Sequence, residues 1–563
     1  MPPQASSRRG RGGALAVGAG IFLSRIAGFV RERALAHYLG NSEAAGAFRA
    51  AMRIPNILQN LLGEGVLSAS FIPVYSKLLA QGQLEEARRA ARAVGTLLAL
   101  MAALVTALGV SAAAPLVDLL APGFEGETRE LTVTLVRVLF PGVALLVLSA
   151  WCLGVLNSHR KFFLSYVSPV LWNAAIVAAA IAFGRRLGGE RSFDLAVALA
   201  WGAVAGSALQ LAVQLPSVLR LLGSLRPSLA VGDPAVRTTL RTFVPVLLGR
   251  GSVQISAYLD QLLASYLGPS IVAAIGYAQT LALLPVSLFG MAVSAAALPE
   301  LSATMATAAT SATSAAAGAT SPASTAGSGP AGAHQAPALP AEVAAALRDK
   351  LRASLRQVVF LVVPSAVAFV AIGDTMIALL FESGRFGAQD TQSVWILLAG
   401  SALGLTASTQ GRLLASSFYA IGDPRPPLRA SLWRVTFTFV AGLVTVFPLR
   451  QALGYDARWA AFGLAAASSL AAWVELTLLR RALARRIESV PLPTRLTLGA
   501  LAAAGAAGAL AAAASWAAAG PLGLPRMLAM AVAPPLFGAT YLGLTMLARV
   551  PEAASLRRRL LRR

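Results

Sequence analysis

The sequence predicts an all-α polytopic membrane protein with about 14 transmembrane helices, and three features of the chain support this fold class. Of its 563 residues, 56% are hydrophobic and 13% are charged, and the mean hydropathy is +0.68. A soluble domain carries about 25% charged residues, so this composition is typical of a protein embedded in lipid. Apolar runs of helix length also recur along the chain, and its two halves share short motifs.

The apolar runs define the predicted spans. About 20 apolar residues are needed to cross a hydrocarbon core of about 30 Å. We expect the second run to be interrupted at Pro55, because proline removes a backbone donor and clashes with the preceding turn. The predicted spans are 14–38, 44–80, 90–115, 129–156, 162–183, 193–219, 238–267, 270–299, 355–373, 390–420, 427–448, 458–480, 497–519 and 524–548.

The basic residues predict the orientation. The net charge of +23 does not indicate nucleic-acid binding, because Lys and Arg recur between the spans, mostly on the side of the N-terminus. This pattern predicts a multi-pass protein of the cytoplasmic (inner) membrane with both termini cytoplasmic. The basic tails are expected to contact anionic membrane lipids. The single cysteine, Cys152, rules out an intramolecular disulfide framework.

A weak repeat and a low-complexity segment organise the chain. The motif at 38–42 recurs at 266–270, and the motif at 71–76 recurs at 297–302. Six spans separate the copies, so we expect two six-helix lobes in parallel pseudo-repeat plus two C-terminal helices. The predicted parts are a basic tail (1–13), an N-lobe (14–222), a C-lobe (236–302 and 342–482), a flexible cytoplasmic linker (303–341), a final helix pair (495–549) and a second basic tail (550–563).

The first span carries polar residues that are costly in lipid. A charged side chain at the centre of a bilayer costs about 2.5–3.5 kcal/mol on insertion scales, so it usually faces a bundle interior or a water-filled path. Arg25 lies near mid-span beside Ser24, and Glu32 lies on the face of Arg25, seven residues on. Arg31 is a further candidate, whereas Arg33 is expected to reach the interface.

Other intramembrane charges extend this set. Arg49 and Arg53 share a helix face in the second span, where an ion pair with Glu64 or Glu32 is the structural alternative to cargo binding. Arg250 lies in the seventh span, near the repeat equivalent of Arg25. Asp260 follows it and could pair with Arg250 or Arg53, or bind a proton or cation.

Guanidinium groups stay charged and bind phosphate oxygens through paired N–H donors, so this excess of arginine favours a diphosphate cargo. We predict that Arg25, Arg31, Arg53, Arg250 and Ser24 bind the diphosphate, and that Glu32, Glu64 and Asp260 are gating residues or charge partners. The sequence contains no nucleotide-binding loop, no metal-ligand set and no nucleophile–base pattern, and this predicts a protein that is not an enzyme.

A set of short motifs occurs in a fixed order along the chain, at 24–32, 53–56, 64–65, 71–74, 254–260 and 418–425. Together these motifs resemble the MurJ (MviN) family of lipid II flippases, within the multidrug/oligosaccharidyl-lipid/polysaccharide exporter superfamily. The resemblance covers about 14 to 550, apart from the linker. It implies two six-helix lobes around a cavity, with a last helix pair that shapes a groove for a lipid tail.

The chain departs from the family pattern at several cavity positions. Gly46 stands where the family usually has Asp. Gln59 and Asn60 stand where the family has a pair of arginines, and residues 279–280 are Gln-Thr where the family has an acidic residue followed by Arg. We take Arg250 as a candidate to compensate for the missing arginines.

The resemblance implies movement of lipid II, the undecaprenyl-diphosphate-linked peptidoglycan precursor, from the cytoplasmic to the periplasmic leaflet by alternating access. The alternatives are another polyprenyl-diphosphate glycan such as an O-antigen unit, a cation-coupled drug exporter, or a non-transporting scaffold. No cofactor is expected. Coupling to the membrane potential or to a monovalent cation stays open, although the span at 427–448 has no Asp or Asn to complete a cation site with Asp260. Cell-wall synthesis enzymes are candidate partners.

Overall fold

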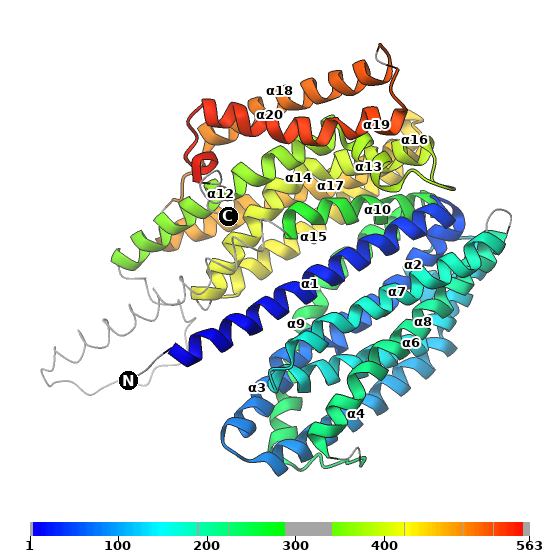
Figure 1. The fold of residues 1–563 in the computed structure, drawn as a ribbon, viewed down its shortest axis with the longest axis vertical. Coiled ribbons are helices and arrows are strands. Elements are labelled where there is room, and N and C mark those ends of the chain that lie inside the picture. The colour runs from blue at the N-terminus through cyan, green and yellow to red at the C-terminus, as the bar shows by residue number, and fades with distance from the viewer. Residues whose placement is uncertain are drawn as a thin grey trace, which may run out of the picture. The chain divides into compact units, whose positions relative to one another are not determined.

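The structure is a computed structural model, and it describes residues 4–187, 191–223, 226–287, 341–421, 423–487, 489–521 and 523–555. Within these ranges the side chains of 4–19, 21, 64, 248–257, 341–343 and 420 are outside the description. The described chain is helical throughout and contains no β-strand, only one isolated bridge between Ser383 and Phe386 (Figure 1). The all-α fold class is therefore confirmed.

The helices divide into two compact units, and the first contains Met1–Tyr277 and Leu380–Thr391. In this unit α7 packs against α1 and α8, α8 packs against α6, and α6 also contacts α2, α3 and α4. Its helices are α1 (Gln4–Leu39), α2 (Glu43–Leu62), α3 (Glu64–Ala80), α4 (Leu84–Ser111), α5 (Ala113–Leu120), α6 (Gly126–Ser158), α7 (Phe162–Leu187), α8 (Ser192–Leu222), α9 (Pro234–Ser265) and the first part of α10 (Pro269–Pro285).

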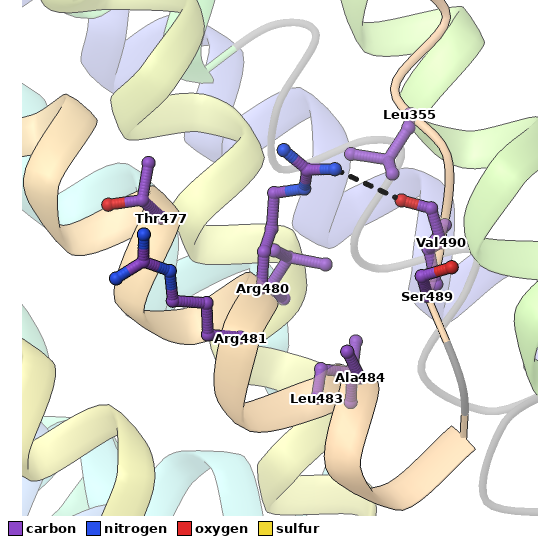
Figure 2. A pocket seen from close by; sticks show the side chains of 9 residues that line it. Leu355, Thr477, Arg480, Arg481, Leu483, Ala484, Ser489 and Val490 are labelled. Atoms are coloured by element: carbon purple, nitrogen blue, oxygen red, sulfur yellow. Dashed lines mark hydrogen bonds between the residues drawn. The ribbon is translucent and has the colours of Figure 1, made fainter.

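The second unit contains Ala278–Leu379 and Gln392–Arg563. Here α15 packs against α17, and α18 packs against α12 and α20, so that the last helices form a layer on α12 (Figure 1). A pocket of about 300 Å³ lies where α17 ends (Figure 2). The helices that begin in or lie within this unit are α12 (Ala341–Ala371), α13 (Gly373–Phe381), α14 (Ala388–Ile421), α15 (Arg425–Val446), α16 (Pro448–Leu453), α17 (Ala457–Ile487), α18 (Thr494–Ala519), α19 (Arg526–Ala531) and α20 (Ala533–Leu547).

Each of the 14 predicted spans coincides with helix in the described residues. Ten helical stretches there are long and apolar enough to cross a membrane. The predicted N-terminal tail 1–13 is helical from Gln4 onward, and the linker 303–341 lies outside the described residues except for Ala341. The helix α9, which we expected to open the second lobe, belongs to the first unit because it packs along α3.

The prediction that Pro55 interrupts the second span is wrong. The helix α2 runs through Pro55 and ends at Leu62, and the break before α3 lies at Gly63. The Gly63 N–H donates to the Gln59 carbonyl at 2.9 Å, and a Cβ at Gly63 would lie 2.3 Å from that oxygen. The turn therefore needs glycine, whereas proline inside a membrane helix removes only one backbone hydrogen bond that neighbours can offset.

The two copies of the repeated Tyr-Leu-Gly motif share one backbone feature. Gly40 has a φ of 66° and Gly268 has a φ of 111°, and both follow the end of a helix. These values lie in the region that glycine adopts without steric cost. The motif therefore marks a left-handed turn between consecutive helices in both places. After the first copy, the Ser42 side chain accepts a hydrogen bond from the Ala45 N–H and caps α2.

Candidate functional site

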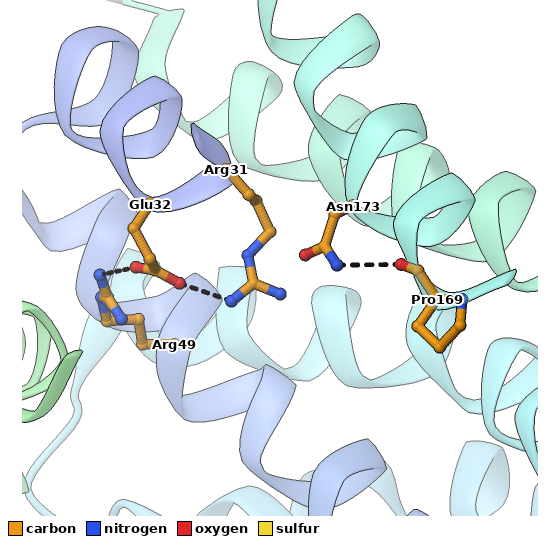
Figure 3. A network of polar contacts seen from close by, with 5 residues as sticks. All are labelled: Arg31, Glu32, Arg49, Pro169 and Asn173. Atoms are coloured by element: carbon orange, nitrogen blue, oxygen red, sulfur yellow. Dashed lines mark hydrogen bonds and ion pairs between the residues drawn. The ribbon is translucent and has the colours of Figure 1, made fainter. Parts of the chain in front are cut away.

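A buried ion-pair network joins α1 to α2 in the first unit. One guanidinium nitrogen of Arg31 and one of Arg49 each donate to the Glu32 carboxylate, and both N–O distances are 2.6 Å (Figure 3). Glu32 is 5% exposed. A buried carboxylate is tolerated only when its charge is paired and its oxygens are hydrogen-bonded, and here both oxygens accept a bond. The triad of Arg31, Glu32 and Arg49 carries a net charge of +1.

Aromatic rings cover both arginines of this triad. The Arg49 guanidinium lies 4.1 Å from the ring centroid of Tyr277, and that of Arg31 lies 5.1 Å from the ring of Trp172. The Tyr277 hydroxyl donates to the Gly40 carbonyl at 2.9 Å, which fixes the ring. A Cβ at Gly276 would lie 2.2 Å from Arg49 Nη1, so the glycine makes room for the stacked guanidinium. Such cation–π contacts contribute about 0.5–2 kcal/mol each.

Unsatisfied polar atoms surround Arg31. Among the described residues, Arg31 Nε, Trp172 Nε1 and Asn173 Oδ1 are buried without a hydrogen-bond partner. The Asn173 amide nitrogen donates to the Pro169 carbonyl at 2.9 Å, and its oxygen points towards the Arg31 side chain (Figure 3). Buried polar groups are rarely left unpaired, and such groups in a native structure commonly mark functional sites. This place offers two N–H donors and one acceptor to a polar ligand.

The same helix presents further polar residues. Arg25 is exposed and has no hydrogen bond or ion pair to any described residue, while Ser24 beside it is half-buried. Arg25 therefore differs from Arg31, whose charge is already shared with Glu32. The Arg33 guanidinium is exposed and donates to the Leu380 carbonyl. Of the three arginines of α1 whose side chains the structure describes, Arg25 is thus the one without a hydrogen bond or ion pair.

Arg53 and Asp260 interact electrostatically. Asp260 on α9 attracts the half-buried guanidinium of Arg53 on α2, which is one of the two arginines that the sequence suggested as its partner. A role of Asp260 as charge partner or gating residue stays a prediction. The Arg49–Glu32 pair likewise corresponds to the structural alternative considered for α2. The side chains of Glu64 and Arg250 lie outside the described residues, so their predicted roles stay predictions.

The structure explains one departure from the family pattern. A Cβ at Gly46 would lie 2.1 Å from the Pro269 carbonyl oxygen, so α2 and the start of α10 touch backbone to backbone there. Aspartate cannot fit at this position. The polar contact between α1 and α2 is made instead by Arg49, less than one turn further along α2, which pairs with Glu32.

Sequence reasoning missed Trp172, Asn173 and Tyr277. None of them is charged, and each approaches an arginine only through the packing of α7 or α10 against α1 and α2. Among the described residues no cluster of three His, Cys, Asp or Glu could hold a metal ion. The chemistry that this site offers is recognition of an anionic, hydrogen-bonding group.

Comparison with solved structures defines the class of protein. The fold matches a chain described as "Lipid II flippase MurJ, inward closed conformation" with a TM-score of 0.72 over 95% of this chain and 98% of that chain, at 19% identity. It also matches an inward-facing multidrug resistance MATE family transporter of the MOP superfamily with a TM-score of 0.61, at 16% identity over 82% and 95% of the two chains. The protein therefore shares the fold of these two multi-pass membrane proteins.

The family follows from the sequence comparisons. The model of the family "Lipid II flippase MurJ" matches residues 35–522. A lipid II flippase MurJ of Burkholderia cenocepacia is 29% identical over 93% of this chain and 94% of its own length. A probable lipid II flippase MurJ of Rhizobium tropici is 30% identical over 84% and 80%. The chain belongs to the lipid II flippase MurJ family, as the sequence motifs indicated.

Proposed function

We propose that this protein moves lipid II, an undecaprenyl-diphosphate-linked disaccharide-peptide, from the cytoplasmic to the periplasmic leaflet of the inner membrane. The family assignment and the names of the curated relatives support this cargo over the other glycolipids and over drug export. The observation that carries the proposal is the net positive triad of Arg31, Glu32 and Arg49, together with the unshared Arg25 on the same helix.

In this proposal Arg25 binds a diphosphate oxygen directly, with Ser24 as a neighbouring hydroxyl donor. Arg31 is held by Glu32 and by the ring of Trp172, so its free Nε–H has a fixed direction and loses little entropy when a ligand binds. Arg53 and Arg250 contribute further positive charge to the diphosphate site. Asp260 attracts the Arg53 guanidinium and holds it in place when no cargo is bound.

Alternating access then carries the headgroup across the membrane without a catalytic step. The negative charge of the diphosphate moves outward, and an inside-negative potential favours this by about 2.3 kcal/mol per charge per 100 mV. We propose that both termini are cytoplasmic, in keeping with the basic segments on that side. If an ionophore that collapses the potential leaves the transport rate unchanged, this energetic part of the proposal is wrong.

The test is growth of a flippase-depleted strain that expresses the wild-type chain or a variant. We expect the wild type to restore growth, and Arg25→Ala and Arg31→Ala to fail at normal membrane abundance. Arg31→Lys keeps the charge but loses the paired N–H geometry, so partial growth is expected. The matched control is Arg191→Ala, because Arg191 lies at an exposed helix end and its partner within the described chain is the exposed Asp194. Wild-type growth with both Arg25→Ala and Arg31→Ala would overturn the proposal.

A further inference from the structure

The pocket at the end of α17 has an apolar floor and a basic rim. Its floor consists of Leu355, Leu414 and Leu483, which are at most 2% exposed and come from α12, α14 and α17. Arg480 and Arg481 stand side by side at its edge (Figure 2). A cavity of about 300 Å³ is large enough for a small polar headgroup or for part of an acyl chain.

The two arginines of this pocket, Arg480 and Arg481, have no carboxylate partner among the residues that the structure describes. Arg480 Nη2 donates to the Val490 carbonyl oxygen at 3.4 Å. Two acidic side chains in the described part of this unit are already paired with other arginines. Glu475 pairs with Arg434 at 2.9 Å, and Asp423 pairs with Arg486 at 3.0 Å. The pocket therefore presents two adjacent positive charges that a phosphate group would complement. 

An exposed face of α17 leads from the apolar part of the helix to this rim. Leu470, Trp473, Thr477 and Arg481 are all exposed, and their spacing of three, four and four residues places them on one side of the helix. The Trp473 indole N–H donates to the Leu403 carbonyl at 2.9 Å, so the ring is held in place. Along this face the side chains change from apolar to aromatic, then to a hydroxyl and finally to a positive charge. A phospholipid that lies along the helix would place its acyl chain on the apolar part and its phosphate at the arginine.

We propose that this pocket is a binding site for the phosphate headgroup of an anionic phospholipid, with an acyl chain along the exposed face of α17. The site lies wholly within the second unit and involves none of the residues assigned to the cargo. Basic pockets between transmembrane helices are known to bind anionic headgroups on the cytoplasmic side. The proposal goes beyond cargo transport, because this lipid is a bound component of the membrane rather than the transported molecule.

The test is native mass spectrometry of the full chain in detergent, with palmitoyl-oleoyl phosphatidylglycerol, palmitoyl-oleoyl phosphatidylcholine or inorganic phosphate added. We expect retained adducts with phosphatidylglycerol, few with phosphatidylcholine and none with inorganic phosphate. The variant Arg480→Gln/Arg481→Gln should bind phosphatidylglycerol about 30-fold more weakly. Each arginine attracts the anionic headgroup, and the double variant loses the sum of both contributions to the binding free energy. The matched control is Arg485→Gln on the same exposed helix end, outside the pocket lining.

Three results would overturn the proposal. Equal losses in the double variant and in Arg485→Gln would show diffuse attraction to a basic helix end. Binding of inorganic phosphate as strong as that of phosphatidylglycerol would show an anion site without a lipid. Displacement of phosphatidylglycerol from this pocket by undecaprenyl diphosphate would assign it to the cargo. Growth of the depleted strain is read separately, so failure of this site leaves the transport proposal untouched.

Discussion

Arg49 on α2 holds Glu32 on α1 through a 2.6 Å ion pair, and its guanidinium stacks on Tyr277 of α10 at 4.1 Å. One side chain thereby connects three helices of the first unit. Arg31 pairs with the same Glu32 carboxylate, so Arg49 also influences where Arg31 is held. Arg49 is therefore a positioning residue for Arg31 as well as a structural contact, and the two roles can be separated by experiment.

We expect Arg49→Met to lower the stability of the protein by about 3 kcal/mol, because it leaves a buried carboxylate with one partner instead of two. Glu32→Gln in the same chain should recover part of this loss, since the uncompensated charge is then removed. Thermal unfolding of the single and double variants in detergent measures the coupling. The control is Arg129→Met, which breaks an exposed ion pair with Asp118 and should change little. Additive effects of the two substitutions would contradict this account.

The close approach at Gly46 gives a second prediction. Gly46→Ala places a Cβ 2.1 Å from the Pro269 carbonyl oxygen, so α2 and α10 must separate, and we expect a loss of about 1–3 kcal/mol. The matched control is Gly505→Ala in α18, where a Cβ meets nothing within 4 Å. That change should stabilise by about 0.5–1 kcal/mol through helix propensity. Thermal unfolding compares the two, and equal shifts would contradict the steric argument.

A buried polar network in the first unit gives a third prediction. The Ser149 hydroxyl of α6 donates to Gln214 Oε1 at 2.8 Å and accepts from Gln210 Nε2 at 2.8 Å, both from α8. Ser149→Ala leaves two buried glutamine groups without this partner, and we expect a loss of about 1–2 kcal/mol. Ser207→Ala is the control, because the Ser207 hydroxyl donates within its own helix to the Ala203 carbonyl and bonds no other helix among the described residues. A similar loss in both variants would show that the network contributes nothing specific.

Hydropathy predicted the helices, because burial of apolar helices in lipid is a local property of the chain. The family was indicated separately, by the resemblance of its ordered motifs. The partners of the charged residues were predictable only where the partner is also charged, as for Arg49 with Glu32. Tyr277, Trp172 and Asn173 approach the arginines through the packing of distant helices, and no spacing in the sequence encodes that contact. The break at Gly63 was misplaced at Pro55, since proline is the stronger local signal while the backbone clash at Gly63 exists only in the folded turn.

We expect the turn between α6 and α7 to make the stability of the protein depend on pH. His159 lies outside the membrane-spanning helices, and its Nε2 is 3.0 Å from the Tyr75 hydroxyl. Burial lowers the pKa of His159 below its ordinary value of 6.5, and the positive charges of Lys161 and Arg88 lower it further. In the unfolded chain this histidine takes up a proton near pH 6.5, whereas the folded protein resists protonation until a lower pH.

The unfolded state therefore binds more protons in the window just below pH 6.5, so stability rises with pH there and is lost as the pH falls. We expect the thermal unfolding temperature of the wild type to drop between pH 7.5 and pH 5.5 by more than that of His159→Gln, which keeps a hydrogen-bonding group but cannot titrate. Lys161→Gln should make the drop smaller, because it removes one of the charges that oppose protonation. Equal pH slopes in the wild type and in His159→Gln would show that other groups control the acid sensitivity of this protein.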